Sequence, residues 1–330
     1  MLMVDKEFII LYKISIVMIR HKLLYKAFAV LMTFVFVSST WAANVAVIKT
    51  RNLAPYNEAI TGFTINCGAV RTQEYDMEED QSRGEAIADQ INKSRPAVVL
   101  AVGAPAAQIA KLYVNTSIPV VFIMVQSPEK IGLQDINNIT GISLNIPVET
   151  QLRALKALVP AVTKVGVLYN PRNTANEISQ AMKISSQLGF RLIAAKIDSP
   201  GDVTRALRAF AEGIDAYWML PDITVLQAFG TILNYTNERR IPSLASSKIM
   251  VDRGALVSLA PNYANIGNQG CGIVNQIISG TKPSQIPIAS PKGLELTVNL
   301  TAAKTLGLQS IATNAMTFAA SEGYKISISQ

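Results

Sequence analysis

Short apolar runs alternate with segments of helical periodicity from residue 43 to the end of the chain. The runs predict strands, and apolar residues that recur every three or four positions predict the helices between them. The run Ala97–Val102 is apolar at every position, which is typical of a parallel strand buried on both faces. Regular alternation of strand and helix favours parallel sheets with helices on both sides. The sequence therefore predicts an α/β fold.

The predicted elements fall into two sets along the chain. The strands are Asn44–Ile48, Val70–Tyr75, Ala97–Val102, Pro119–Met124, Lys164–Tyr169, Arg191–Ile197, Ala216–Leu220, Pro242–Ala245 and Ala255–Leu259. The helices are Pro55–Phe63, Gly84–Lys93, Pro105–Tyr113, Val148–Leu158, Ala175–Leu188, Gly201–Phe210 and Asp222–Thr236. This number of β-α units exceeds one small sheet, and a polar connection at 140–147 separates the two sets. We therefore expect two Rossmann-like lobes with parallel sheets.

The first 42 residues have a different pattern. A basic stretch at 18–26 precedes the apolar run Ala27–Val37, and small residues lead to a predicted cut after Ala42. This order is typical of a secretory signal peptide, and the apolar run is too short to span a bilayer comfortably. We interpret residues 1–42 as a signal peptide whose true start is Met18; an uncleaved membrane anchor is the alternative. The expected location is the periplasm, in soluble form.

Charge and residue counts exclude several classes of function. Residues 43–330 carry 25 basic and 21 acidic side chains, and their longest basic stretch is Arg239-Arg240. Nucleic-acid binding, which needs a stripe of basic side chains, is therefore not expected. The only histidine is His21, in the predicted signal peptide, which excludes histidine-based catalysis and histidine-ligated zinc in the mature chain. No phosphate loop or G-x-G-x-x-G motif occurs, and we expect no metal and no cofactor.

Candidate binding residues lie in the loops that follow the strands, because ligands of open parallel sheets bind at the carboxyl ends of the strands. The loop after Val102 opens a helix with Gly103-Ala-Pro-Ala106, whose backbone N–H groups and helix dipole favour an anion. An ordinary tight turn is the alternative. Asp222 is interpreted either as the N-cap of the next helix or as counter-ion to a ligand ammonium. Tyr56 and Tyr169 either cover a flat ligand or are structural.

Two other features of the sequence leave alternatives open. An acidic group lacks the regular spacing of metal ligands and is interpreted as a solvated surface turn. It consists of Glu74, Asp76, Glu78, Glu79 and Asp80. Cys67 and Cys271 are too few and too far apart in sequence for a metal cluster. An oxidising compartment would allow them to pair, but neither pattern nor spacing requires it.

A series of short motifs runs in order through nearly all of the mature chain. They are Val102-Gly-Ala-Pro-Ala-Ala-Gln, Ile118-Pro-Val-Val-Phe, Ser127-Pro, Ile139-Thr-Gly-Ile-Ser, Val165-Gly-Val-Leu-Tyr-Asn-Pro171, Pro221-Asp222, Ile241-Pro-Ser, Gly254-Ala-Leu and Leu294-Glu-Leu-Thr-Val-Asn299. Together they resemble the substrate-binding proteins of ABC-type importers, in the branch that includes tryptophan- and tyrosine-binding members.

The resemblance implies a type I periplasmic-binding-protein fold, in which two lobes close on a ligand by hinge motion. It places residues 43–142 and 260–288 in lobe 1, and 143–259 and 289–330 in lobe 2. It implies a small polar or aromatic, amino-acid-like ligand and an inner-membrane ABC permease as partner. We expect a monomer that is not an enzyme. The expected ligand-binding residues are Tyr56, Ala104, Pro105, Ala106, Ser127, Tyr169, Asn170, Asn173, Asp222 and Ser246.

The chain departs from the family pattern at two of these positions. Ala104 stands where the family usually has threonine, and Ser127 where it usually has aspartate. The first loop, Leu53-Ala-Pro-Tyr56, also differs from the commoner His-Pro-Ala-Leu form. The resemblance to the family therefore supports the fold more strongly than it supports a particular ligand. Two alternative functions remain, an exported sensory protein that uses the same fold and a histidine-free α/β enzyme.

Overall fold

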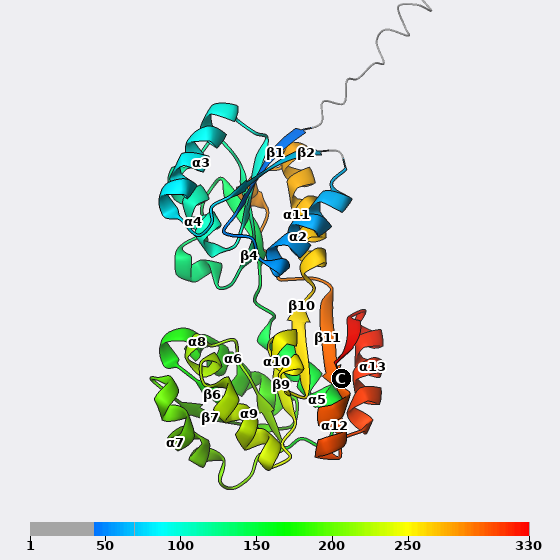
Figure 1. Ribbon diagram of the computed structural model, residues 1–330. Coiled ribbons are helices and arrows are strands. Elements are labelled where there is room, and N and C mark those ends of the chain that lie inside the picture. The colour runs from blue at the N-terminus through cyan, green and yellow to red at the C-terminus, as the bar shows by residue number, and fades with distance from the viewer. Residues whose placement is uncertain (1–42, 69, 330) are drawn as a thin grey trace, which may run out of the picture. The chain divides into compact units, whose positions relative to one another are not determined.

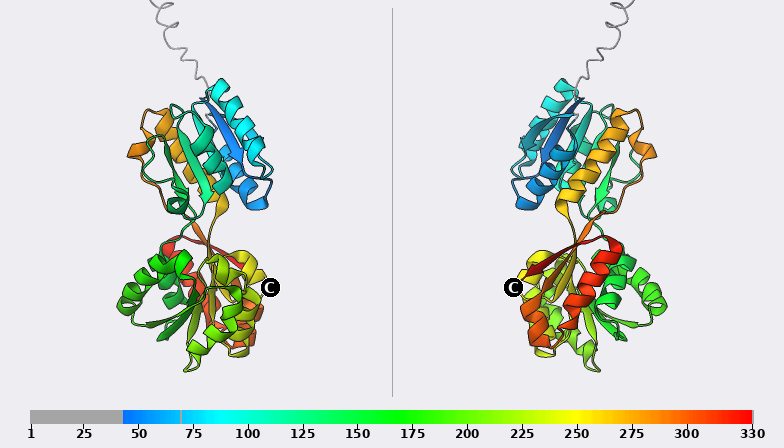
Figure 2. Two further views of the ribbon diagram at one scale, coloured as in Figure 1. Left: turned by 90° about the vertical axis from the view of Figure 1, so that its left-hand side faces the viewer. Right: turned by 90° about the vertical axis from the view of Figure 1, so that its right-hand side faces the viewer.

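The computed structural model describes residues 43–68 and 70–329, so the predicted signal peptide and its start codon lie outside the described residues. The described residues form two α/β lobes, each built around its own sheet (Figure 1). Both lobes have helices on the two faces of their sheet (Figure 2). The predicted fold class is confirmed.

The sheet of lobe 1 is wholly parallel. In spatial order its strands are β2 (Val70–Asp76), β1 (Ala43–Lys49), β3 (Val98–Val102), β4 (Val120–Val125) and β5 (Ile139–Ser143). The helices of this lobe are α2 (Ala54–Asn66), α3 (Gln81–Ser94), α4 (Ala104–Tyr113), α11 (Tyr263–Ile278) and the 3-10 turns η1 (Pro128–Ile131) and η4 (Pro283–Gln285).

Alternate residues of β1 enter two separate cores. Val45 and Val47 pack with α2 and α11, whereas Ala46 and Ile48 pack with α3 and α4. Because both faces of the sheet are covered, its inner strands are apolar at successive positions, as the sequence pattern predicts.

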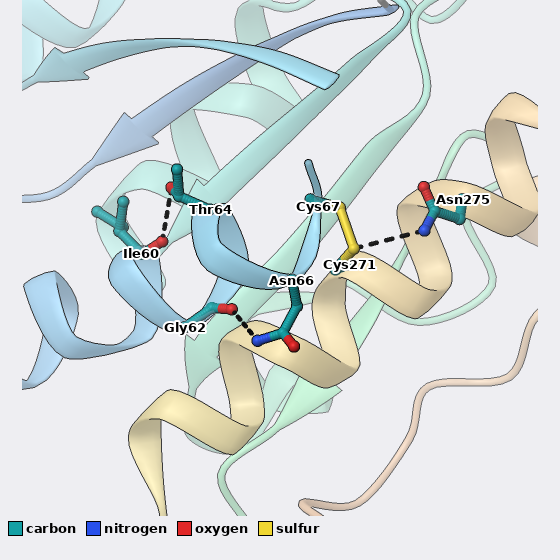
Figure 3. The surroundings of a disulfide bond; sticks show 7 residues. All are labelled: Ile60, Gly62, Thr64, Asn66, Cys67, Cys271 and Asn275. Carbon is teal, nitrogen blue, oxygen red and sulfur yellow. Dashed lines mark hydrogen bonds between the residues drawn. A yellow bond between two sulfur atoms is a disulfide. The ribbon is translucent and has the colours of Figure 1, made fainter. Parts of the chain in front are cut away.

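Helices α2 and α11, which are distant in sequence, pack at very close range. Gly62 and Gly267 lie where they cross, and a Cβ at either position would overlap backbone atoms of the other helix. Cys67, just beyond α2, forms a disulfide with Cys271 of α11, and their Cα atoms are 5.5 Å apart (Figure 3). The pairing that the sequence left open is therefore formed. The disulfide joins α11, which comes late in the chain, to the N-terminal part of lobe 1.

The sheet of lobe 2 contains one antiparallel pair. In spatial order its strands are β12 (Lys325–Ser329), β11 (Leu294–Asn299), β10 (Val257–Pro261), β9 (Ser243–Ala245), β8 (Ala216–Trp218), β6 (Lys164–Tyr169) and β7 (Arg191–Lys196). Only β10 and β11 run antiparallel. No crossover within this sheet joins them, because the chain returns to β11 from α11 and η4 of lobe 1.

The helices of lobe 2 cover both faces of its sheet. They are α5 (Val148–Leu158), α6 (Pro171–Gln187), α7 (Val203–Ala206), α8 (Ile223–Leu226), α9 (Phe229–Glu238), α10 (Lys248–Asp252), α12 (Leu300–Leu306), α13 (Ser310–Glu322) and the 3-10 turns η2 (Pro200–Asp202) and η3 (Leu207–Phe210). The chain passes between the sheets after β5, after β10 and before β11. The exact residues at which the lobes divide stay a prediction.

Several predicted elements differ from the structure. The helix predicted at Gly201–Phe210 is divided into η2, the four-residue helix α7 and η3, and that at Asp222–Thr236 is divided into α8 and α9. The segment predicted as a polar connection contains β5, whose five residues are all buried. Its polar side chains do not prevent burial, because Thr140 Oγ1 donates to the carbonyl oxygen of Ile286 at 2.7 Å. Strands β11 and β12 and helices α10 to α13 were not predicted.

Candidate ligand-binding site

A cavity of about 640 Å³ lies among loops and helix ends of both lobes. Its polar lining consists of Gln126, Ser127, Glu129, Lys130, Asn145, Gln151, Asn173, Thr174, Asn176, Glu177, Gln180, Ser246, Ser247, Tyr263 and Ser290. Its apolar lining consists of Leu144, Ile146, Pro147, Val148, Leu220, Pro221, Ile223, Leu226, Met250, Leu259 and Pro261. The volume and the mixed lining are typical of small-molecule sites.

Three of the predicted ligand-binding residues line this cavity. Ser127 precedes η1 in lobe 1, Asn173 lies in the first turn of α6, and Ser246 follows β9 in lobe 2. Loops after strands of both sheets therefore converge on one cavity, as expected for parallel sheets. Direct contact of these residues with a ligand stays a prediction.

A buried polar network joins the loops after β6 and β8, beside the cavity. Asp222 caps α8 by accepting a hydrogen bond from the Thr224 N–H at 2.9 Å, which confirms the N-cap interpretation. Its carboxylate also accepts from the Asn170 N–H at 2.9 Å, Asn173 Nδ2 at 2.9 Å and Thr174 Oγ1 at 2.8 Å. Burial alone would raise the pKa of Asp222, but these hydrogen bonds together outweigh burial and lower the pKa below its usual value.

The geometry leaves Asp222 without capacity for a ligand. Each carboxylate oxygen already accepts two hydrogen bonds, which is the full acceptor capacity of the group. The side chain is fully buried and lies outside the set of residues that line the cavity. The structure therefore does not support the predicted role of Asp222 as direct counter-ion to a ligand ammonium. Asn170 is also buried in the network, with its Nδ2 donating to Thr224 Oγ1.

The predicted anion site at the start of α4 is a tight turn. Gly103 has φ 94°, and a Cβ there would overlap the Thr50 hydroxyl, so the turn requires glycine. The Ala106 N–H is donated to Thr50 Oγ1 at 3.3 Å, and Pro105 has no N–H. Ala104, Pro105 and Ala106 all lie outside the cavity lining. Most of the backbone N–H groups on which the anion prediction depended therefore either donate within the protein or do not exist.

The two predicted tyrosines lie outside the cavity lining, and a third lies within it. Tyr169 is only 8% exposed and packs in the core between the sheet of lobe 2 and α5 and α6, so its structural interpretation holds. Tyr56 of α2 is half-buried against Gly103, and burial raises the pKa of its hydroxyl. Tyr263, the first residue of α11, lines the cavity, and burial also raises the pKa of Tyr263. Sequence reasoning missed Tyr263 because α11 was not predicted.

Lobe 1 supplies a cation to the cavity from η1, which follows β4. Met124, at a register shift inside β4, and Ser127, just before η1, have φ values of 60° and 50°. Such positive φ values are uncommon for residues other than glycine and frequent near functional sites. Lys130 of η1 lines the cavity, and its Nζ donates to the backbone oxygen of Asn173 in lobe 2. The sequence signal for Lys130 was its position three residues after Ser127.

Lobe 2 supplies a fixed amide from α5. The Gln151 side chain lines the cavity, accepts from Trp218 Nε1 at 2.9 Å and donates through Nε2 to the Ile146 oxygen at 2.8 Å. These bonds hold Gln151 in a single orientation. The sequence predicted the helix at Val148–Leu158 but did not single out Gln151, because candidate residues were taken only from loops that follow strands.

The acidic group at 74–80 is a salt-bridged surface rather than a ligand set. Glu79 pairs with Arg51 at 2.8 Å, Glu78 pairs with Arg83 at 3.1 Å, and Asp80 caps α3. Across residues 43–68 and 70–329, no group of three or more His, Cys, Asp or Glu side chains is placed to hold a metal ion. In the same ranges, no helix combines the length and apolar character needed to cross a membrane.

Two α/β lobes connected by three crossings, with a cavity lined from both, define a two-lobed ligand-binding protein. Comparison with known families identifies which one. The profile of the family described as "ABC transporter substrate binding protein" matches residues 65–320, and the chain belongs to this family. The resemblance inferred from the motifs is confirmed.

Individual relatives agree with this assignment. A tyrosine-binding protein of Clostridioides difficile (strain R20291) is 22% identical over 241 residues, which is 71% of this chain and 70% of that protein. A ligand-free, open substrate-binding protein from Clostridium difficile has a TM-score of 0.73 at 20% identity, covering 88% of this chain and 100% of the other. A Streptococcus pneumonia ABC domain in complex with L-Trp has a TM-score of 0.59 at 21% identity, covering 83% and 98%. At these identities the two structures show a shared fold.

Proposed function

We propose that this protein is the periplasmic solute-binding component of an ABC-type importer. It would bind a small polar or aromatic, amino-acid-like ligand between its lobes, change no bond in it, and deliver it to an inner-membrane permease. The observation that carries the proposal is the cavity of about 640 Å³, lined from both lobes of a family fold whose function is substrate binding. Hinge closure would trap the ligand between the lobes.

The lining supports a ligand with charged ends and a flat body. Lys130 is a cation that suits a carboxylate, and Glu129 and Glu177 are anions that suit an ammonium. Tyr263 offers an aromatic surface for a ring. Names of relatives point the same way, since one is a tyrosine-binding protein and one was solved with L-Trp.

Two independent features support export. The order of basic, apolar and small residues in 1–42 is that of a signal peptide. The disulfide between Cys67 and Cys271 is of a kind that persists in oxidising compartments such as the periplasm.

The proposal is tested by adding L-tyrosine and L-tryptophan to the purified mature chain and measuring the melting temperature. A ligand at about 100 times its dissociation constant stabilises the folded state by about 2.7 kcal/mol, which raises the melting temperature by about 5–10 °C. We expect Lys130→Met to weaken binding by calorimetry about tenfold. Lys183→Met is the matched control, because Lys183 is exposed on α6 outside the cavity lining. No shift with either amino acid would contradict the ligand class, and turnover of either would contradict the binding-only mechanism.

A further inference from the structure

One polar side chain of the cavity, Asn173, is held from behind by the buried carboxylate of Asp222. Asn173 lines the cavity, whereas Asp222 is fully buried outside the lining. The Asn173 Nδ2 group donates to Asp222 Oδ1 at 2.9 Å and to Thr224 Oγ1 at 3.2 Å. An amide nitrogen has two hydrogens, and these two acceptors use both.

The direction of the Asn173 amide follows from this pairing. An ionised carboxylate can only accept hydrogen bonds, so the end of the amide that meets Asp222 must be the nitrogen. Asp222 itself cannot turn, because the Asn170 N–H, the Thr224 N–H and the Thr174 hydroxyl hold both of its oxygens. With Nδ2 fixed toward the network, Oδ1 is the polar atom that Asn173 has left for a ligand.

We propose that Asp222 is a positioning residue of the ligand cavity, which holds Asn173 so that its Oδ1 acceptor is offered to the ligand. The ligand would then place an N–H or O–H donor at this point, such as an ammonium, a hydroxyl or a ring N–H. The inference rests on the proposed function, since it takes the cavity as the ligand site. It assigns the carboxylate an indirect role, in contrast to direct pairing with a ligand ammonium.

The orientation can be tested in the ligand-free protein by NMR of side-chain amides. The Asn173 NH₂ signals, assigned by their loss in Asn173→Ala, should be shifted downfield and protected from exchange with water. In Asp222→Asn, which keeps the size but removes the charge, protection should fall about tenfold or more. Signals of Asn176, an exposed lining residue of the same helix, should stay unchanged. If Asp222→Asn fails to fold, Thr224→Val takes its place. This variant removes only the second acceptor of the Asn173 NH₂ group and should reduce protection of the same signals.

Unchanged Asn173 signals in these variants would overturn the positioning role. Binding provides a second readout, with L-tyrosine titrated calorimetrically into wild type, Asp222→Asn, Asn173→Ala and the double variant. Each single change should weaken binding about tenfold, because each removes one oriented hydrogen bond to the ligand. The double variant should bind no more weakly than Asn173→Ala. Additive losses would overturn action through Asn173. If wild type binds neither L-tyrosine nor, in the same titration, L-tryptophan, the proposed ligand class fails, while the NMR result still decides the orientation.

Discussion

Breaking the disulfide between Cys67 and Cys271 is expected to destabilise lobe 1 by about 3–5 kcal/mol. The two cysteines are separated by 204 residues. The chain-entropy relation gives about 5 kcal/mol at 25 °C for a loop of that length, and loss of a native disulfide typically costs about 2–5 kcal/mol. Both cysteines are 3% exposed, so alanine at both positions adds only small cavities. Asn275 Nδ2, which donates to Cys271 Sγ at 3.4 Å, belongs to an exposed residue and can donate to water instead.

Urea unfolding measures this effect. We expect Cys67→Ala/Cys271→Ala to unfold at a lower urea concentration than the oxidised wild type, by about 1 M or more. Reductant should bring the wild type to the midpoint of the double variant and should leave the double variant unchanged, which makes that variant its own control. Trp218 is the only tryptophan outside residues 1–42, and it lies in the core of lobe 2. Its fluorescence therefore reports lobe 2 separately from the circular dichroism of the whole chain.

A stricter test is which lobe loses stability when the disulfide is absent. The disulfide lies wholly within lobe 1, so the loss of stability should appear in the circular dichroism before the Trp218 transition moves. A wild-type protein whose unfolding is insensitive to reductant would refute the entropy argument. A Trp218 transition that shifts as far as the circular dichroism would refute its assignment to lobe 1 alone.

Three further outcomes are expected. Because hydrogen bonds lower the pKa of Asp222 in the folded state, the ionised carboxylate stabilises the fold above pH about 5, and this stabilisation is lost as pH falls below about 4. Between pH 6 and 3, the free energy of unfolding in urea should therefore fall less for Asp222→Asn than for wild type. Gly267→Ala should lower the free energy of unfolding by about 2–3 kcal/mol, since its Cβ would overlap the Ala59 carbonyl of α2. Gly272→Ala in the same helix meets no atom within 4 Å and should leave stability unchanged or raise it by up to about 1 kcal/mol.

Much of the fold follows from local patterns, and the errors have identifiable causes. The all-apolar strand at Val98–Val102 was predictable because a doubly covered strand needs apolar residues on both faces. Strand β5 was not, since its threonine, serine and glycine are compatible with a loop until partners from 286–289 pair with its edge. The antiparallel place of β11 was equally hidden, because it depends on a return from the other lobe.

The candidate site shows the same division. Ser127, Asn173 and Ser246 were found from the rule that ligands bind at the carboxyl ends of parallel strands. Tyr169 was misplaced because the sequence does not reveal that the last residue of β6 turns toward the core. Tyr263 follows β10, whose strand was predicted at Ala255–Leu259, but it was missed because the helix that begins at Tyr263 was not predicted.

The sequence by itself determined the α/β class, the two sets of strands and helices and the family, because each depends on short-range periodicity or on ordered motifs. Only the tertiary structure decided that Cys67 and Cys271 pair, which side chains line the cavity, and that the Asp222 carboxylate accepts its hydrogen bonds from other groups of the protein. These outcomes depend on contacts between residues far apart in sequence, whose distances and hydrogen-bond capacity exist only once the chain is packed.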